Sequence, residues 1–212
     1  MLQAKTVLLA TGGAGRIFAA STNAFINTGD GLGMAARAGI PLEDMEFWQF
    51  HPTGVAGAGV LLTEGCRGEG AILRNSNGER FMERYAPTLK DLAPRDFVSR
   101  CMDQEIKEGR GTENGGVWLD VSHLPRETIM SRLPRVYQTL METQMLDITK
   151  DPIEIAPTAH YSMGGVWVDP VDHSTDVEGL WAIGEASSGL HGANRLGGNS
   201  LIELLVFGRI VG

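Results

Sequence analysis

TVLLATGGAG, residues 6–15, is the stretch that decides the fold class of this chain. A short apolar, partly β-branched run that stops at a glycine loop is typical of a buried strand followed by a tight turn. Because chains rarely open on a buried strand, we expect something before it. Residues 30–38 (DGLGMAARA) then have a helix-forming composition, and Gly39-Ile40-Pro41 would end that helix. Together the two pieces predict the interior of an α/β domain.

The middle of the chain has a different texture. From residue 43 onward, short apolar stretches alternate with turns, and residues 96–107 predict an amphipathic helix that could bury Phe97, Cys101 and Ile106. Residues 124–146 predict one or two further helices, since Pro134 can break them.

After residue 151 the α/β texture returns. Strands are predicted at residues 165–168 and 179–183, and residues 200–211 (SLIELLVFGRIV) predict a strongly apolar helix. We therefore expect an α+β domain at 43–165, inserted in an α/β domain whose two pieces, 1–42 and 166–212, both look truncated.

Composition limits the function. The chain has 212 residues and a net charge of −8, which argues against sequence-independent binding of nucleic acid, because such binding needs excess Lys and Arg. Cys66 and Cys101 show no zinc-ligand spacing and predict two reduced thiols. No apolar run reaches the roughly 18 to 20 residues that span a bilayer, so any membrane attachment would come through partners.

Glycine is abundant, at 28 residues, but no GxGxxG motif is present. The nearest match, Gly31, Gly33 and Ala36, opens a helix without a convincing strand before it. It favours a pair of helix-packing glycines over a dinucleotide fingerprint.

Several charged and polar residues lie in glycine-framed or proline-framed loops. His51 in FHPTG and His160 in AHYS, taken alone, are more typical of structural histidines, and His123 and His173 of ordinary surface histidines. The block at 63–70, TEGCRGEG, combines two acids and one base with three glycines. In isolation it is most simply a salt-bridged turn.

Two arginines stand near helix starts. Arg95 directly precedes Asp96, which could cap the helix and leave Arg95 to point elsewhere. Arg195 lies in HGANRLGGNS, a polar loop that feeds the last helix, where backbone N–H groups and a guanidinium favour an anion. Two histidines, two arginines and a threonine in such loops predict a small carboxylate ligand rather than a metal.

Read in order, these loops resemble the flavoprotein subunit of succinate dehydrogenase and fumarate reductase. The resemblance covers essentially the whole chain and rests on six motifs, FHPTG, LTEGCRGEG, GERFMERYA, APRD, PTAHYSMGG and HGANRLGGNSL. It implies an α+β capping domain inserted in a truncated, Rossmann-like α/β FAD-binding domain.

The resemblance also implies residue roles. Arg95 resembles the arginine that moves the proton, and Glu64 and Arg67 the relay that connects it to solvent. The groups that resemble the family's carboxylate binders are His51, Thr63, His160 and Arg195. Contacts to FAD would come from Thr11, Gly12, Gly13, Asp30, Glu185, Asn199, Ser200 and Leu201. The family's GxGxxG segment and flavin-linking histidine would precede Met1, so we expect this chain alone to bind FAD weakly or not at all and to be inactive.

The reaction implied is interconversion of succinate and fumarate by hydride transfer with FAD. L-aspartate oxidase is a close relative with the same histidine, arginine and threonine positions, and a non-catalytic binding module is the other alternative. The expected partners are a dicarboxylate, an iron-sulfur subunit and membrane anchor subunits, which would place the protein in the cytoplasm, peripheral to the inner membrane.

Overall fold

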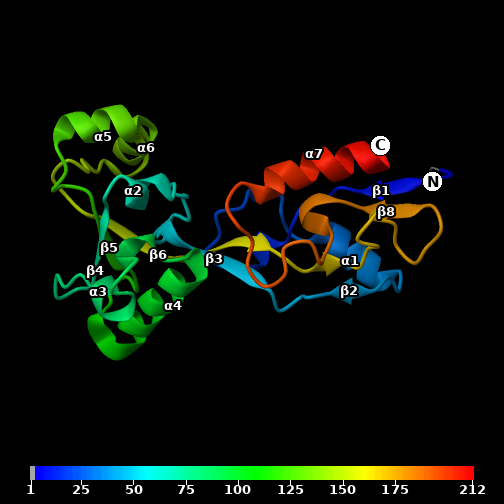
Figure 1. The fold of residues 1–212 in the computed structure, drawn as a ribbon, viewed down its shortest axis with the longest axis horizontal. Coiled ribbons are helices and arrows are strands. Elements are labelled where there is room, and N and C mark those ends of the chain that lie inside the picture. The colour runs from blue at the N-terminus through cyan, green and yellow to red at the C-terminus, as the bar shows by residue number, and fades with distance from the viewer. Residues whose placement is uncertain (1–2) are drawn as a thin grey trace. The chain divides into compact units, whose positions relative to one another are not determined.

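The structure, a computed structural model, describes residues 3–212, and these divide into two compact units (Figure 1). Unit 1 consists of the described residues up to Gln49 and of Ala159–Gly212, and unit 2 is Phe50–Thr158. Each unit mixes helices and strands. The domain expected at 43–165 contains all of unit 2 and extends beyond it at both ends.

Unit 1 contains two short strand pairs. β1 (Val7–Leu9) pairs with β8 (Leu180–Ala182) in parallel, and β2 (Leu42–Glu43) pairs with β7 (Gly165–Val166) in the antiparallel sense. The other elements are η1 (Gly15–Ile17), α1 (Asp30–Arg37), η4 (Gly184–Ala186) and α7 (Asn199–Val211). Parallel strands cannot be joined by a tight hairpin and need a long connection between them. The parallel pairing of β1 with β8, which lie far apart in the sequence, is therefore typical of an α/β domain.

The apolar core of unit 1 is small. It is formed by Ala14, Leu32, Ala35, Val166, Val168 and Ala182. The expectation that β1 is fully buried is wrong, since Val7 is 48% and Leu8 43% exposed. Within residues 3–212 β1 has only β8 as a strand partner, so these two side chains stay uncovered.

Unit 2 is built around an antiparallel sheet. β4 (Ile72–Arg74) pairs with β5 (Val117–Asp120), and β5 pairs with β6 (Ile153–Ser162); β3 (Trp48–Val55) completes the order β3-β6-β5-β4. The chain enters unit 2 along β3 and leaves it along β6. The helices are α2 (Gly65–Gly68), α3 (Met82–Tyr85), η2 (Lys90–Leu92), α4 (Arg95–Glu105), η3 (Ile106–Arg110), α5 (Arg126–Arg132) and α6 (Pro134–Gln144).

The core of unit 2 is larger and follows the sequence pattern. On β5, Val117 and Leu119 are fully buried while Trp118 and Asp120 are only half-buried, which is the alternation of a sheet with one packed face. Cys101 on α4 is buried, whereas Phe97 and Ile106 pack at the edge of the core. Both cysteines are free thiols, as predicted.

The sequence signals for helix boundaries mostly succeed. Pro134 begins α6, because proline suits the first helical position and cannot continue α5. Capping of α4 by Asp96 is wrong: α4 begins at Arg95 after Pro94 without a side-chain cap, and Asp96 pairs instead with Arg100 at 2.9 Å, one turn along the helix.

A fully buried carboxylate ties the outer segments of unit 2 together. Glu105, at the end of α4, accepts hydrogen bonds from Arg110 Nε at 2.7 Å, Tyr85 Oη at 2.7 Å and Asn75 Nδ2 at 2.9 Å, and it also pairs with Arg84. The Arg110 hydrogen bonds outweigh the effect of burial and lower the pKa of Glu105 to about 2.

Glu105→Gln should therefore destabilise the folded chain by about 3 kcal/mol near pH 7. Because the pKa is depressed on folding, the wild-type advantage is complete above the unfolded-state pKa of about 4.5 and is lost as the pH falls toward 2. Urea denaturation at pH 7, 5 and 3.5 measures it. Glu113→Gln, at an exposed turn, is the control; a difference independent of pH would contradict the assignment.

Gly116→Ala should also destabilise unit 2. A Cβ at this position would lie 2.4 Å from the backbone oxygen of Ile155 on β6, so the strands would have to separate. We expect a loss of about 1 to 3 kcal/mol in the free energy of unfolding, measured by urea denaturation. Gly68→Ala in α2, where nothing lies within 4 Å, should be neutral or slightly stabilising. Equal effects of the two substitutions would disprove the steric explanation.

Candidate functional site

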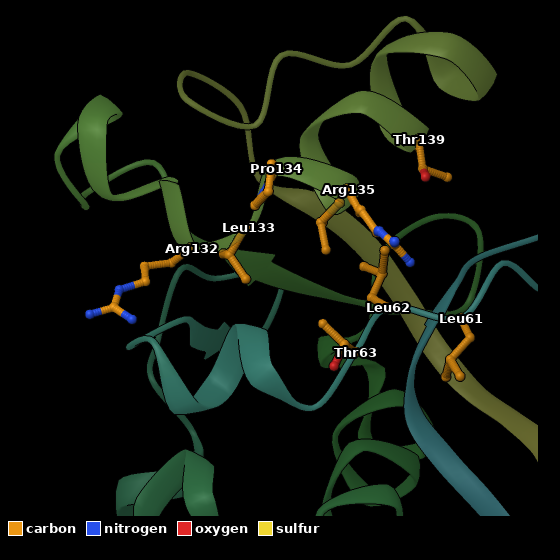
Figure 2. Close-up of a pocket in the computed structure, with 9 residues that line it drawn as sticks. Leu61, Leu62, Thr63, Arg132, Leu133, Pro134, Arg135 and Thr139 are labelled. Carbon is orange, nitrogen blue, oxygen red and sulfur yellow. The ribbon is translucent and has the colours of Figure 1, made fainter. Parts of the chain in front are cut away.

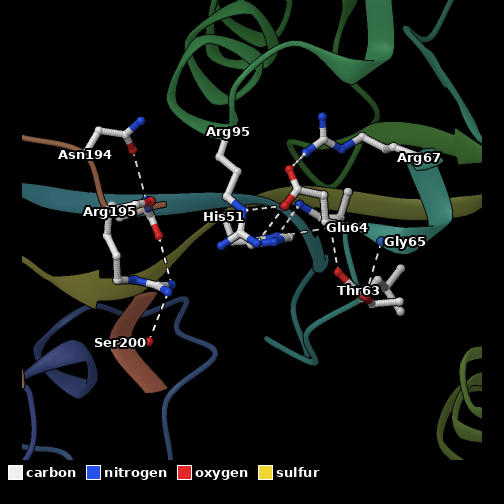
Figure 3. A network of polar contacts seen from close by, with 12 residues as sticks. His51, Thr63, Glu64, Gly65, Arg67, Arg95, Asn194, Arg195 and Ser200 are labelled. Atoms are coloured by element: carbon white, nitrogen blue, oxygen red, sulfur yellow. Dashed lines mark hydrogen bonds and ion pairs between the residues drawn. The ribbon is translucent and has the colours of Figure 1, made fainter. Parts of the chain in front are cut away.

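In unit 2, one carboxylate is shared by two arginines (Figure 3). Glu64 Oε1 accepts a hydrogen bond from Arg67 Nη2 at 2.7 Å, and Glu64 Oε2 accepts two from Arg95, from Nε at 3.0 Å and Nη2 at 2.7 Å. The three residues predicted to move a proton are thus in direct contact, in the order Arg67, Glu64, Arg95.

This contact shifts two pKa values. Burial alone would raise the pKa of Glu64, but the hydrogen bonds and charges of Arg95 and Arg67 outweigh it and lower that pKa. Burial lowers the pKa of Arg67, and the charge of Arg95 acts in the same direction. The Glu64 side chain is 45% exposed, against 15% for Arg95 and 1% for Arg67, so the carboxylate is the most exposed member of the group.

Local structure holds the arginines in place. Arg67 sits on the single turn of α2, and its Nη1 donates to the backbone oxygens of Asp91 at 2.6 Å and Ala93 at 3.1 Å. The Asp91 carboxylate is itself fixed by Arg80 at 2.6 Å and by the N–H of Leu73 at 3.1 Å. The segment that leads to Arg95 is therefore tied to α2 through Arg67.

His51 is buried on β3 and its hydrogen bonds indicate a tautomer. The N–H of Thr53 donates to His51 Nδ1 at 3.2 Å, and the Thr53 hydroxyl, which donates to Leu62 O at 2.7 Å, lies 3.1 Å from the same nitrogen. Because Nδ1 accepts, we assign the proton of the neutral ring to Nε2. His51 can then act as a single hydrogen-bond donor.

Thr63 is exposed and its hydroxyl accepts a hydrogen bond from the N–H of Gly65 at 3.2 Å. It also borders a cavity of about 440 Å³ within unit 2 (Figure 2). The cavity is lined by Leu61, Leu62, Thr63, Arg132, Leu133, Pro134, Arg135, Val136 and Thr139. None of the other predicted site residues lines it.

In unit 1, Arg195 is buried and held from several sides. Its Nη1 donates to Ser200 Oγ at 3.1 Å and its Nη2 to Gln49 Oε1 at 3.0 Å (Figure 3), while the guanidinium carbon lies 4.4 Å from the centre of the Tyr161 ring. Ser200 belongs to the first turn of α7, so Arg195 lies beside that helix start, as the sequence predicted.

His160, on β6 in unit 1, is positioned by residues 22 and 23. Its Nδ1 lies 2.7 Å from the Thr22 hydroxyl, and its backbone oxygen accepts a hydrogen bond from Asn23 Nδ2 at 2.9 Å. Asn23 is buried, so this contact fixes the strand where His160 projects.

A buried carboxylate of unit 1, Glu203, supports this part of the unit. It is 4% exposed and pairs with His191 Nε2 at 2.8 Å and with the Tyr161 hydroxyl at 3.2 Å. Burial and the charge of Glu203 raise the pKa of Tyr161, so the phenol stays protonated. Glu203 therefore fixes the ring on which the Arg195 guanidinium stacks.

The residues predicted for FAD fit a ligand rich in hydroxyl and phosphate groups. Thr11, Asp30 and Asn199 are exposed, and their side chains form no hydrogen bond within residues 3–212. The first turn of α7 has no side-chain cap. The N–H groups of Asn199 and Leu201 donate to Leu196 O at 3.2 Å and Gly198 O at 3.1 Å, while the N–H of Ser200 has no backbone partner within residues 3–212 and remains for an acceptor.

At two positions near these residues, Gly13 and Gly31, a larger residue would clash with a neighbouring side chain. A Cβ on Gly13 would lie 2.2 Å from Glu185 Oε1, and a Cβ on Gly31 would lie 1.9 Å from Thr11 Oγ1. Glu185 accepts a hydrogen bond from the N–H of Ser162 at 2.9 Å, and burial raises its pKa to about 7. Gly12 has a φ of +74°, a conformation that glycine adopts without strain.

No group of His, Cys, Asp and Glu within residues 3–212 has the arrangement of a metal site. None of the helices in this range has the length and hydrophobicity that a membrane crossing requires.

One histidine prediction is wrong. His173 is not a surface residue: it is 2% exposed, its ring stacks on Phe207 at 3.5 Å between centroids, and its Nδ1 lies 3.1 Å from Ala182 O. His123 is exposed, as predicted.

Sequence reasoning missed the residues that hold the site. Gln49, Thr53, Asp91, Tyr161 and Glu203 are buried polar residues in contact with predicted site residues or their segments. An acid within the apolar run of 200–211 was a usable signal for Glu203, since a lone buried carboxylate needs partners. Nothing in the local sequence marked Gln49.

The chain is similar to known flavoproteins over almost its whole length. The model of the FAD binding domain family matches residues 1–201. The succinate dehydrogenase flavoprotein subunit of Rickettsia felis is 54% identical over 98% of this chain and 37% of its own length. A subunit of the fumarate reductase (CoM/CoB) of Methanothermobacter marburgensis is 51% identical over 99% of the chain and 39% of its own length.

Solved structures share the fold. FrdA of Escherichia coli quinol fumarate reductase superposes with a TM-score of 0.92 at 47% identity, over 97% of this chain and 37% of that protein. The chain thus spans less than two-fifths of the length of these relatives. With a family match over nearly its whole length, this chain belongs to the FAD binding domain family.

Proposed function

We propose that this chain is the part of a succinate dehydrogenase or fumarate reductase flavoprotein that carries most of its dicarboxylate-handling residues. The observation that supports this most directly is the Arg67, Glu64, Arg95 contact in unit 2. A carboxylate that bridges an inner arginine and a helix-start arginine, and is itself half exposed, is suited to pass a proton between solvent and Arg95.

In this proposal the carboxylates of the substrate are bound by hydrogen-bond donors and by positive charge. His51 and Thr63 of unit 2 and His160 and Arg195 of unit 1 supply these groups. Arg195 offers a planar guanidinium that matches a carboxylate, and neutral His51 offers the Nε2 proton assigned above.

The bound flavin would supply the hydride acceptor in the oxidation of succinate or the hydride donor in the reduction of fumarate. Thr11, Gly12, Gly13, Asp30, Glu185, Asn199, Ser200 and Leu201 are the residues proposed to hold it. Arg95 takes the matching proton from the carbon next to the other carboxylate, or returns it, so that one hydride and one proton are moved for each double bond made or removed.

Partners and location follow from the same proposal. A flavoprotein subunit of this kind would pass electrons to an iron-sulfur subunit and be held at the inner membrane by anchor subunits, on the cytoplasmic side. The names of the relatives, which describe subunits, support this part of the proposal. We also propose that unit 2 is the capping domain that the family resemblance implies.

The alternative activity, oxidation of L-aspartate, uses the same histidine, arginine and threonine positions. The names of the relatives above favour the dicarboxylate reaction. The complete flavin-loaded protein, assayed with succinate, fumarate and L-aspartate separately, decides between them. Turnover of L-aspartate alone would replace the proposal, and binding of all three without turnover would indicate a non-catalytic module.

Arg95→Gln in the complete protein should lower kcat at least about 100-fold, because the group that moves the proton is lost. Flavin content should stay near the wild-type value. Steady-state assays with succinate and with fumarate measure the effect. Arg100→Gln, one turn further along α4 and with a side chain 67% exposed, is the matched control and should keep wild-type turnover. Unimpaired turnover of Arg95→Gln would remove Arg95 from its role.

His160→Ala should mainly weaken dicarboxylate binding. Loss of one hydrogen bond to a carboxylate predicts a rise in substrate Kd of about 10-fold or more. The measurement is a titration of the flavin absorbance of the complete protein with succinate. His123→Ala, at an exposed turn of unit 2, should leave the Kd unchanged; an unchanged Kd for His160→Ala would contradict the assignment.

A further inference from the structure

Gln49 makes an unusual set of contacts for a buried amide. It is 2% exposed, at the end of the first segment of unit 1, and its side-chain amide makes three hydrogen bonds, all with Asn194 and Arg195. Its Nε2 donates to Arg195 O at 2.6 Å and to Asn194 Oδ1 at 2.9 Å. Its Oε1 accepts from Arg195 Nη2 at 3.0 Å.

These bonds hold both ends of one residue. One part of the amide fixes the main chain of Arg195, and the other part fixes its guanidinium, so the side chain between them has little freedom left. A purely structural buried glutamine would need only backbone partners to be satisfied. Here the acceptor oxygen of Gln49 instead binds the guanidinium of Arg195, the group that is proposed to bind the substrate.

The remaining contacts of the guanidinium agree with this orientation. Ser200 Oγ accepts from Nη1 at 3.1 Å, and the Tyr161 ring lies against the guanidinium at 4.4 Å. A plane held by two acceptors on different nitrogens and by an aromatic face is fixed in direction as well as in position. An arginine that is ordered beforehand loses less freedom when it binds an anion, which increases affinity.

We propose that Gln49 is a positioning residue for Arg195, which it orients for a substrate carboxylate. The inference rests on the proposed function, in which Arg195 binds the dicarboxylate. It assigns Gln49 a role in substrate affinity that acts through Arg195, without requiring Gln49 to contact the substrate.

The test uses the complete flavin-loaded protein and malonate as the probe. Malonate has two carboxylates but only one carbon between them, so it can bind without being dehydrogenated. Gln49→Met keeps the volume and removes all three hydrogen bonds. We expect the malonate Kd to rise about 10-fold and the KM for succinate to rise with it, while kcat changes less than about threefold.

Controls separate positioning from folding. Gln138→Met, at an exposed site on α6, should keep the wild-type Kd. Flavin content and Tm report on folding; a merely structural Gln49 would change these and leave the Kd of the folded protein unaltered. If Gln49→Met does not fold, Gln49→Asn serves instead, because its amide is one methylene too short to hold Arg195 O and Nη2 together.

The outcomes are distinct. A malonate Kd within twofold of the wild-type value in the folded variant would overturn the role of Gln49 while leaving the proposed function intact. A wild-type protein that binds neither malonate nor succinate would overturn the proposed function and this inference with it.

Discussion

The buried guanidinium of Arg67 is the constraint on which the candidate site in unit 2 depends. A charge that is 2% exposed must have hydrogen-bonding partners, because an unpaired buried charge costs several kcal/mol. Arg67 finds them in Glu64 and in the backbone oxygens of Asp91 and Ala93. These hydrogen bonds of the Arg67 Nη atoms fix the carboxylate on one side and the approach to Arg95 on the other.

In unit 1, the buried guanidinium of Arg195 has several neutral groups among its partners. Arg195 is 6% exposed and contacts an amide, a hydroxyl and an aromatic ring, and its charge partly offsets the rise that burial causes in the pKa of Glu185. Neutral acceptors orient a guanidinium without cancelling its charge, whereas a carboxylate neighbour would compete with an anionic ligand. Glu203, the buried carboxylate of this region, is kept for His191 and Tyr161. The neutral contacts of Arg195 fit the carboxylate-binding role proposed for it.

The sequence predicted where helices and strands lie better than it predicted which residues are buried or exposed. The strand at 6–10, the helix break at Pro134 and the helix at 200–211 were visible because proline, glycine and apolar runs act locally. The exposure of Val7 and the burial of His173 depend on which distant segments cover them, and local patterns do not contain that information. The same limit applies to the site. Glu64, Arg67 and Arg95 could be named from motifs, but Gln49 meets Arg195 only through a contact 146 residues apart.

The pKa shifts of Glu64 and Arg67 place a condition on how the proposed proton relay would work. The pKa of a carboxyl group is ordinarily about eight units below that of a guanidinium, so a carboxylate is a poor acceptor for a proton from arginine. Here the pKa of Arg67 is lowered, but that of Glu64 is lowered too, so this difference in pKa persists while both arginines are charged. The charges that depress the Glu64 pKa are those of its two arginine partners. When Arg95 gives up its proton, one of these charges disappears and Glu64 becomes a better proton acceptor at that moment. In the proposed relay Glu64 therefore carries the proton only transiently, after the proton leaves one arginine and before an arginine takes it up again.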